Sequence, residues 1–182
     1  MVRYREWYGA SGPNKGLKMT AEDVAKGIRQ REKGDPKMSR SVLDPSAFSV
    51  DGGPSIAERM HTMKVKFGKA DNRRIAKKGA MSGWDQLRSR LKGDDDGNPM
   101  IVFFDDCRDA IRTLPALQHD ENNPEDADTN GEDHAPDEIR YACMARPYIK
   151  PKPKDPDREW TYKPPTFNEA ILRAERNNSM RR

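Results

Sequence analysis

The segment EDHAPDEIRYACMARP, residues 132–147, places three acids and a histidine at the start of an expected helix. Asp133 and Asp137 are four residues apart, and His134 precedes Asp137 by three, so these side chains can share one helical face. Oxygen ligands gathered in this way suit a hard divalent cation. The alternative is an ordinary helix start, with Asp133 as the N-cap and Asp137 in the first turn, where negative charge is favourable. Spacing alone leaves both interpretations open.

A further acid, Asp44, ends the short strand expected at residues 41–44 and precedes Pro45. Strand ends open into crevices, which are common places for ligands. Acids that converge from separate elements repel one another unless a positive charge neutralises them. Two divalent ions about 3.5–4 Å apart can activate water and stabilise the leaving oxygen of a phosphodiester. The residues therefore suggest Asp44, Asp133 and Asp137 as catalytic and metal-binding acids, with His134 as a further ligand.

Other acids and histidines have simpler interpretations. Asp94–Asp96 lie in the turn DDDGNP, and Asp105–Asp106 are expected to cap a helix. His61 and His119 have no neighbours at ligand-like spacing, so we expect them to be ordinary surface or partly buried histidines.

Charge is distributed very unevenly along the chain. Residues 1–92 contain 21 Lys and Arg against 10 Asp and Glu, whereas residues 93–137 contain 2 against 14. Such a division predicts a basic surface for a polyanion beside an acidic cluster, or simply solvated charged faces. The basic residues predicted to contact DNA phosphates are Lys64, Lys66, Lys69, Arg73, Arg74, Lys77, Lys78, Arg88 and Arg90.

Strands and helices alternate in the pattern of hydrophobic residues, which predicts a mixed α/β fold. Strands are expected at 2–9, 41–44, 65–70 and 100–104, and helices at 20–34, 55–63, 83–91, 105–117 and 133–145. Ile101–Phe104 and Val42–Leu43 are expected to lie inside the sheet. From Pro147 the sequence is rich in Pro and Lys, so residues 148–182 are expected to form an extended or disordered tail.

Overall composition limits the possibilities further. Of the 182 residues, 34% are hydrophobic and 35% charged, which allows only a modest core. The sequence contains no apolar run of membrane-spanning length, and its first residues do not form a signal peptide. Cys107 and Cys143 carry no pairing signature, so we expect both to be reduced and buried.

Six groups of residues occur in a characteristic order along residues 2–147. They are YREWYG; KMTAEDVAKGI; LDPSAF with GGPSIAERM; ADNRRI with GAMSGWDQLRSRL; PMIVFFDDCRDAIRTLPALQHD; and EDHAPDEIRYACMARP. Together they resemble the nuclease half of the large terminase subunit of tailed phages. That family cuts concatemeric phage DNA and pumps it into the procapsid.

The resemblance implies a ribonuclease H-like fold whose carboxylate cluster binds Mg²⁺ or Mn²⁺. One family acid ends a strand before a Pro-Ser-type turn, which corresponds to Asp44 in LDPSAF. The last set opens a helix in the pattern (E/N)-(D/H)-x-x-D-A-L-R-Y, which corresponds to Asp133, His134 and Asp137. By resemblance, residues 132–147 are thus a metal site and a helix start at once.

This chain departs from the family in two ways. Glu138 and Ile139 stand where Ala-Leu is usual, and Pro136 precedes them, which a first helical turn tolerates. The family also has an acid on a first strand, with a hairpin partner, before the YREWYG-like strand, and an ATPase half with a phosphate-binding loop. No GxxxxGK[ST] motif occurs in this sequence. We therefore expect a C-terminal terminase portion with an incomplete two-metal site, from a split gene or a remnant.

Two functions follow as expectations. The first is the nuclease portion of a terminase, with an ATPase segment, a small terminase subunit, a portal and double-stranded DNA as implied partners in the host cytoplasm, and no membrane. The second is a non-catalytic fragment that binds DNA or a packaging partner and needs an upstream chain for activity.

Overall fold

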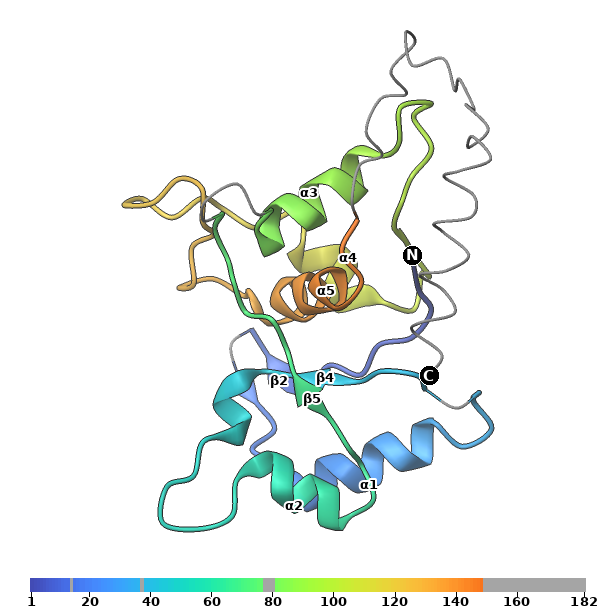
Figure 1. The fold of residues 1–182 in the computed structure, drawn as a ribbon, viewed down its shortest axis with the longest axis vertical. Helices are drawn as coiled ribbons and strands as arrows, with labels where there is room; N and C mark the ends of the chain where they lie inside the picture. Colours follow the sequence, from blue (N-terminus) through green and yellow to red (C-terminus); the bar gives the residue numbers. More distant parts are fainter. Residues whose placement is uncertain (14, 37, 77–80, 149–182) are drawn as a thin grey trace, which may run out of the picture. The chain divides into compact units, whose positions relative to one another are not determined.

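Within the part of the chain that the structure describes, five helices and three small sheets form a mixed α/β arrangement (Figure 1). The structure, a computed structural model, describes residues 1–13, 15–36, 38–76 and 81–148. These residues belong to one unit, Met1–Tyr148. The Pro- and Lys-rich tail expected at 148–182 lies, beyond Tyr148, outside the described residues.

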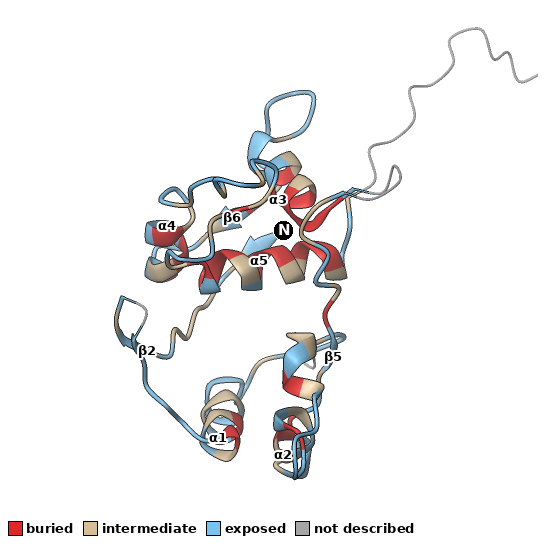
Figure 2. Ribbon diagram, turned by 90° about the vertical axis from the view of Figure 1, so that its left-hand side faces the viewer, coloured by how far each residue is buried: buried red, intermediate tan, exposed pale blue. Residues whose placement is uncertain are grey.

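Two helices, α1 (Ala21–Arg31) and α2 (Ile56–Thr62), lie side by side and enclose a small hydrophobic cluster (Figures 1 and 2). Ala21 and Ala25 of α1 pack with Met60 of α2 and with Val65 just beyond it. Small alanines allow the helices to approach closely, so α1 packs on α2 through its apolar face.

Both helices begin with side-chain caps. The hydroxyl of Thr20 accepts a hydrogen bond from the backbone N–H of Asp23. Ser55 and Glu58 form a reciprocal capping box, in which each side chain accepts from the backbone N–H of the other residue. These local interactions explain why the expected helices at 20–34 and 55–63 form, with slightly shorter bounds.

The larger hydrophobic cluster lies among α3 (Gly83–Lys92), α4 (Arg108–Thr113) and α5 (His134–Ala145). Figure 2 shows the buried residues of α3 and α5 on the faces that these helices turn toward each other. We call this set the Trp84 cluster; its buried members are Trp84, Leu87, Ile101, Cys107, Ala110, Ala127, Ile139 and Cys143. Both cysteines are free and buried, which confirms the expectation from the sequence.

Within the described ranges, the strands pair in three separate two-stranded sheets rather than in one continuous sheet. β1 (Val2–Arg3) is parallel to β6 (Val102–Phe103), and β4 (Val42–Leu43) is parallel to β5 (Gly68–Lys69). β2 (Ala10–Gly12) and β3 (Lys15–Gly16) form an antiparallel pair. The strand expected at 2–9 is therefore much shorter, and the chain leaves β1 after two residues.

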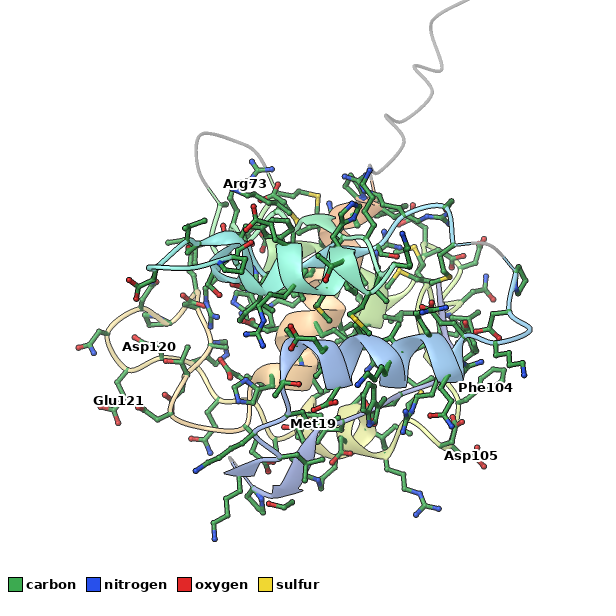
Figure 3. All side chains as sticks on the ribbon, turned by 90° about the horizontal axis from the view of Figure 1, so that it is seen from below. Met19, Arg73, Phe104, Asp105, Asp120 and Glu121 are labelled. Carbon is green, nitrogen blue, oxygen red and sulfur yellow. The ribbon has the colours of Figure 1, made fainter. Side chains whose placement is uncertain are left out.

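The expectation that Ile101–Phe104 lies wholly inside is wrong. Ile101 is buried, but the exposed fractions of Val102 and Phe104 are 38% and 54%. Alternate residues of a strand point to opposite faces, and the Trp84 cluster covers only one face of β6. Figure 3 shows Phe104 and the adjacent Asp105 at the edge of the molecule. In β4, Val42 and Leu43 are partly buried.

Helix α4 is shorter than the expected helix at 105–117 and begins at Arg108. Its N-cap residue, Cys107, makes no side-chain capping hydrogen bond. Instead, the carboxylate of Glu6 accepts hydrogen bonds from the backbone N–H groups of Asp109 and Ala110, at 2.7 and 3.0 Å. A residue distant in sequence thus supplies the cap, which explains why the expected cap at Asp105–Asp106 is wrong.

No helix in the described ranges is both long and apolar enough to cross a membrane.

Candidate functional site

Asp44 occupies the end of β4, where the chain turns into a short 3-10 helix, Pro45–Phe48. Its Oδ1 atom accepts a hydrogen bond from the backbone N–H of Ser46 at 2.7 Å, and its Oδ2 atom accepts one from the phenol of Tyr141 on α5. Burial acts against ionisation, but the hydrogen bonds from Ser46 and Tyr141 outweigh it, so the pKa of the Asp44 carboxyl is lowered. Asp44 is therefore a fixed, ionised carboxylate.

The pKa of the Tyr141 phenol shifts in the opposite direction to that of Asp44. Burial, together with the hydrogen bond to Asp44, raises its pKa to about 12. Tyr141 therefore remains a neutral donor at physiological pH and joins α5 to the end of β4.

Asp133 is the N-cap residue of α5, but its side chain makes no capping hydrogen bond. Its carboxylate lies 3.6 Å from Nδ1 of His134 and 4.0 Å from Nη1 of Arg74. Burial and the nearby charge of Asp137 raise the pKa of Asp133 above its ordinary value. Asp133 therefore occupies the N-cap position without capping the helix. Its carboxylate is partly buried, and its nearest cationic group, on Arg74, is 4.0 Å away.

Asp137 lies one turn further along α5 and is held between two guanidinium groups. Both of its oxygens lie 3.2 Å from Nη1 of Arg74, and its Oδ1 atom accepts a hydrogen bond from Nε of Arg140 at 3.0 Å. The side chain of Arg140 is only 1% exposed, so Asp137 neutralises a buried charge. Asp137 thus forms an ion pair with Arg140 within α5.

Arg74 connects these acids to the loop that precedes α5. Its Nε atom donates to Oδ1 of Asp126 at 2.7 Å, and its Nη2 atom donates to the carbonyl of Ala127 at 3.2 Å. The same Asp126 oxygen accepts a hydrogen bond from the indole N–H of Trp84 at 2.7 Å. Burial opposes ionisation of Arg74, but Asp126 and Asp137 outweigh it and raise the pKa of the guanidinium.

The sequence gives no specific motif for the contact between Arg74 and Asp126. Its only indication is the complementary charge of the basic segment 71–80 and the acidic segment 118–131. Charge complementarity does not identify which residues pair, so the sequence predicts Arg74 on a DNA-binding surface instead.

A cleft of about 600 Å³ brings three of the four predicted site residues together. Asp44, His134 and Asp137 all line it, along with Tyr141 and residues from α1 and β4. Asp133 is not among the lining residues. The cleft is therefore shared by the end of β4 and the first turns of α5, the two elements on which the sequence placed its acids.

Among the residues that the structure describes, no three His, Cys, Asp or Glu side chains are close enough to hold one metal ion. Asp44 already accepts hydrogen bonds from Ser46 and Tyr141, and Asp137 already pairs with two arginines. In this arrangement the acids do not fit Mg²⁺ or Mn²⁺, because protein groups take the positions next to their oxygens.

The remaining acids and histidines have local roles. Asp94 accepts hydrogen bonds from the backbone N–H groups of Asp96 and Asn98, as expected for a turn. Asp120 does the same for Asn122 and Asn123, and Figure 3 shows Asp120 at the outer edge of the acidic loop. His61 and His119 are exposed, and the ring of His119 contacts a backbone carbonyl.

The residues predicted to bind DNA do not share one environment. Lys64, Lys66 and Lys69 are exposed around the start of β5. Arg73 is exposed and pairs with Asp71, and Figure 3 shows it at the edge of the molecule.

The two predicted DNA contacts on α3 differ in burial. Arg88 is exposed, whereas Arg90 is buried and donates to the carbonyl of Arg146. Lys77 and Lys78 lie outside the described residues. The exposed lysines are therefore the clearest cationic surface of the set.

Comparisons with protein-family models, with curated proteins and with solved structures gave no match to this chain.

Proposed function

We propose that this chain is the ribonuclease H-like nuclease portion of a phage large terminase, which cuts concatemeric double-stranded DNA during genome packaging with Mg²⁺ or Mn²⁺. The observation that carries the proposal is the common cleft of Asp44, His134 and Asp137. These residues come from separate elements, and the resemblance assigns the same positions to the family's metal site. The ordered series of six motifs supports the same assignment.

The local structure supports a role for Asp44 in particular. This residue follows a strand that is paired in parallel, and it opens into the cleft. Two hydrogen bonds fix its orientation and keep it ionised. The helix start at Asp133 and Asp137 supplies the second group of acids.

The proposal also has to account for the arginines on these acids. Arg74 and Arg140 neutralise Asp137, so the proposal requires the described arrangement to be a resting form. Activity then requires a rearrangement, or further ligands from another segment such as the acid that the family carries on its first strand.

Cleavage of supercoiled plasmid DNA in the presence of Mn²⁺ tests the proposal. The chain is assayed alone and together with the polypeptide encoded immediately upstream. We expect low or no cutting by the chain alone, ion-dependent cutting by the combination, and loss of cutting with Asp44→Ala. Asp51→Ala is a matched control, because Asp51 is an exposed aspartate on the same segment. Cutting that survives Asp44→Ala would contradict the proposal.

A non-catalytic DNA-binding fragment is the second candidate. It is favoured by the exposed lysines Lys64, Lys66 and Lys69, whose ammonium groups can contact phosphates without sequence preference. Binding of a short duplex should weaken with salt, and substitution of all three lysines by Glu should reduce both the affinity and the salt dependence. DNA binding without cutting under any of the above conditions would favour this candidate over the nuclease.

A further inference from the structure

Two side chains of α3 hold the backbone of the segment that follows α5. The Nε2 atom of Gln86 donates to the carbonyl of Tyr148 at 2.9 Å, and its Oε1 atom accepts from the N–H of the same residue at 2.6 Å. One turn further along α3, Nη2 of Arg90 donates to the carbonyl of Arg146. We call residues 146–148 the strap. In all of these contacts the strap contributes backbone atoms.

These contacts select a backbone conformation rather than particular side chains. One residue uses both the donor and the acceptor of the Gln86 amide, as a residue of a neighbouring β-strand would use a backbone N–H and C=O. Pro147 lies between the bonded residues and has no N–H, so the segment needs no donor there. Arg146 and Pro147 are exposed, so their side chains do little to fix the strap. The site therefore suits an extended segment with proline at its middle position.

The strap leaves part of the Arg90 guanidinium without a partner. Arg90 is only 8% exposed, and its Nε atom is buried without a hydrogen-bond partner. Within the ranges that the structure describes, no carboxylate forms an ion pair with it either. By contrast, Arg88 on the same helix is exposed and lies 4.0 Å from Asp85. A buried cation without a counter-ion is unfavourable, and a carboxylate that accepts from Nε would offset that cost.

We propose that α3 carries a binding site for an extended acidic peptide, in which proline follows Asp or Glu, and that the strap closes this site in the present structure. Gln86 binds the backbone of the residue after the proline. Arg90 binds the residue before it, through both the backbone carbonyl and the side-chain carboxylate. The ligand is a segment of a partner protein that displaces the strap. The inference is independent of the nuclease proposal, because neither side chain lines the cleft of Asp44 and Asp137.

The end of α5 is anchored separately from the strap. Arg40 donates to the carbonyl of Ala145 at 3.1 Å, and the N–H of Arg146 donates to the carbonyl of Cys143 at 3.3 Å. Helix α5 also packs on α3 through the Trp84 cluster. Residues 147 and 148 can therefore leave α3 by rotation of the backbone after Arg146, while both helices stay in place.

The test measures binding of two labelled peptides to the full chain carrying Tyr148→Pro, by fluorescence anisotropy. This substitution removes the N–H that Gln86 accepts, so it weakens the strap and frees the site. The Arg peptide, acetyl-Ala-Arg-Pro-Tyr-Ile-amide, repeats residues 145–149, and the Asp peptide has Asp in place of Arg. We expect the Asp peptide to bind about tenfold more tightly, because its carboxylate gives Arg90 a charged acceptor.

Two matched variants separate this contact from general charge attraction. Arg90→Met in the same background should remove the preference for the Asp peptide. Arg88→Met, which removes an exposed positive charge from the same helix, should keep it. Methylation of the Tyr nitrogen in the Asp peptide removes the donor to Gln86 and should weaken binding about fivefold. Absence of binding, equal affinities for the two peptides, or a preference that survives Arg90→Met would overturn the inference.

The unmodified chain provides a second readout, which also serves if Tyr148→Pro does not fold. Hydrogen exchange at the amide of Tyr148 reports whether the strap is bound, because this N–H donates to Gln86. An excess of the Asp peptide should speed the exchange severalfold by displacing the strap, and the same excess of the Arg peptide should have a smaller effect. Exchange that the Asp peptide leaves unchanged would contradict displacement and with it the proposed site.

Discussion

The phenol of Tyr141 donates a hydrogen bond to the carboxylate of Asp44, which lies 97 residues earlier in the chain. This contact joins the middle of α5 to the end of β4, and both residues line the same cleft. The orientation of the candidate catalytic acid thus depends on a helix whose first turn carries the other acids.

We expect Tyr141→Phe to lower the free energy of unfolding by about 1–2 kcal/mol, because an ionised, partly buried acceptor loses its donor. The pKa of Asp44 should rise, since one of the hydrogen bonds that lower it is removed. Urea denaturation and NMR titration of the Asp44 carboxyl measure these effects. Tyr4→Phe is the control: Tyr4 also bonds a carboxylate, that of Asp35, but at an exposed site, and it should change stability little.

Gly83→Ala should destabilise the chain by about 1–3 kcal/mol through overpacking. A Cβ atom at Gly83 would lie 2.6 Å from Cγ of Arg140 and 2.8 Å from the carbonyl oxygen of Arg73. Arg140 is buried and cannot easily move aside. Gly53→Ala is the matched control because nothing lies within 4 Å of its Cβ position. Equal melting temperatures for the two variants would show that Arg140 has room to shift.

Glu6→Gln should weaken the start of α4 and cost about 1–2 kcal/mol, since a charged acceptor at two helix N–H groups becomes neutral. Amide hydrogen exchange at Asp109 and Ala110 should become faster. Glu125→Gln, at an exposed loop position, should leave both measurements unchanged. Unaltered exchange in Glu6→Gln would mean that another group caps α4.

The ion pair between Glu22 and Arg59 predicts a specific acid response. Hydrogen bonds from Arg59 lower the pKa of Glu22 from 4.5 to about 2. A lowered pKa in the folded state stabilises the fold above pH 4.5, and this contribution disappears as the pH falls toward 2. Glu22→Gln should therefore flatten the decline of unfolding free energy between pH 4.5 and 2. Urea denaturation at several pH values measures it; Asp23→Asn, on the exposed face of α1, is the control.

Local signals predicted the helices better than the strands. Thr20 and Ser55 cap their helices through contacts within three residues, so their short-range patterns are sufficient. The start of α4 depends on Glu6, more than one hundred residues away, which no local pattern can indicate. The exposure of Val102 and Phe104 likewise depends on which other elements pack against β6. A continuous apolar run in the sequence does not show whether one face of the strand is covered or both.

The sequence likewise predicts only part of the candidate site. Asp44 and the acids of α5 could be chosen from the sequence because a strand end and a helix start are local features. Asp44 and Asp137 line one cleft, and their catalytic role stays a prediction. The role of Arg74 could not be predicted, because its partner Asp126 lies 52 residues away in a loop without periodicity.

The burial of Cys107 and Cys143 makes the two thiols internal reporters of the larger core. Burial raises the pKa of both, so neither is an effective nucleophile while the fold is intact. Alkylating reagents can then reach them only when the packing around Trp84 opens. The rate of alkylation, measured by mass spectrometry, therefore reports how often the packing around α5, the helix that begins at Asp133 and carries Asp137, opens.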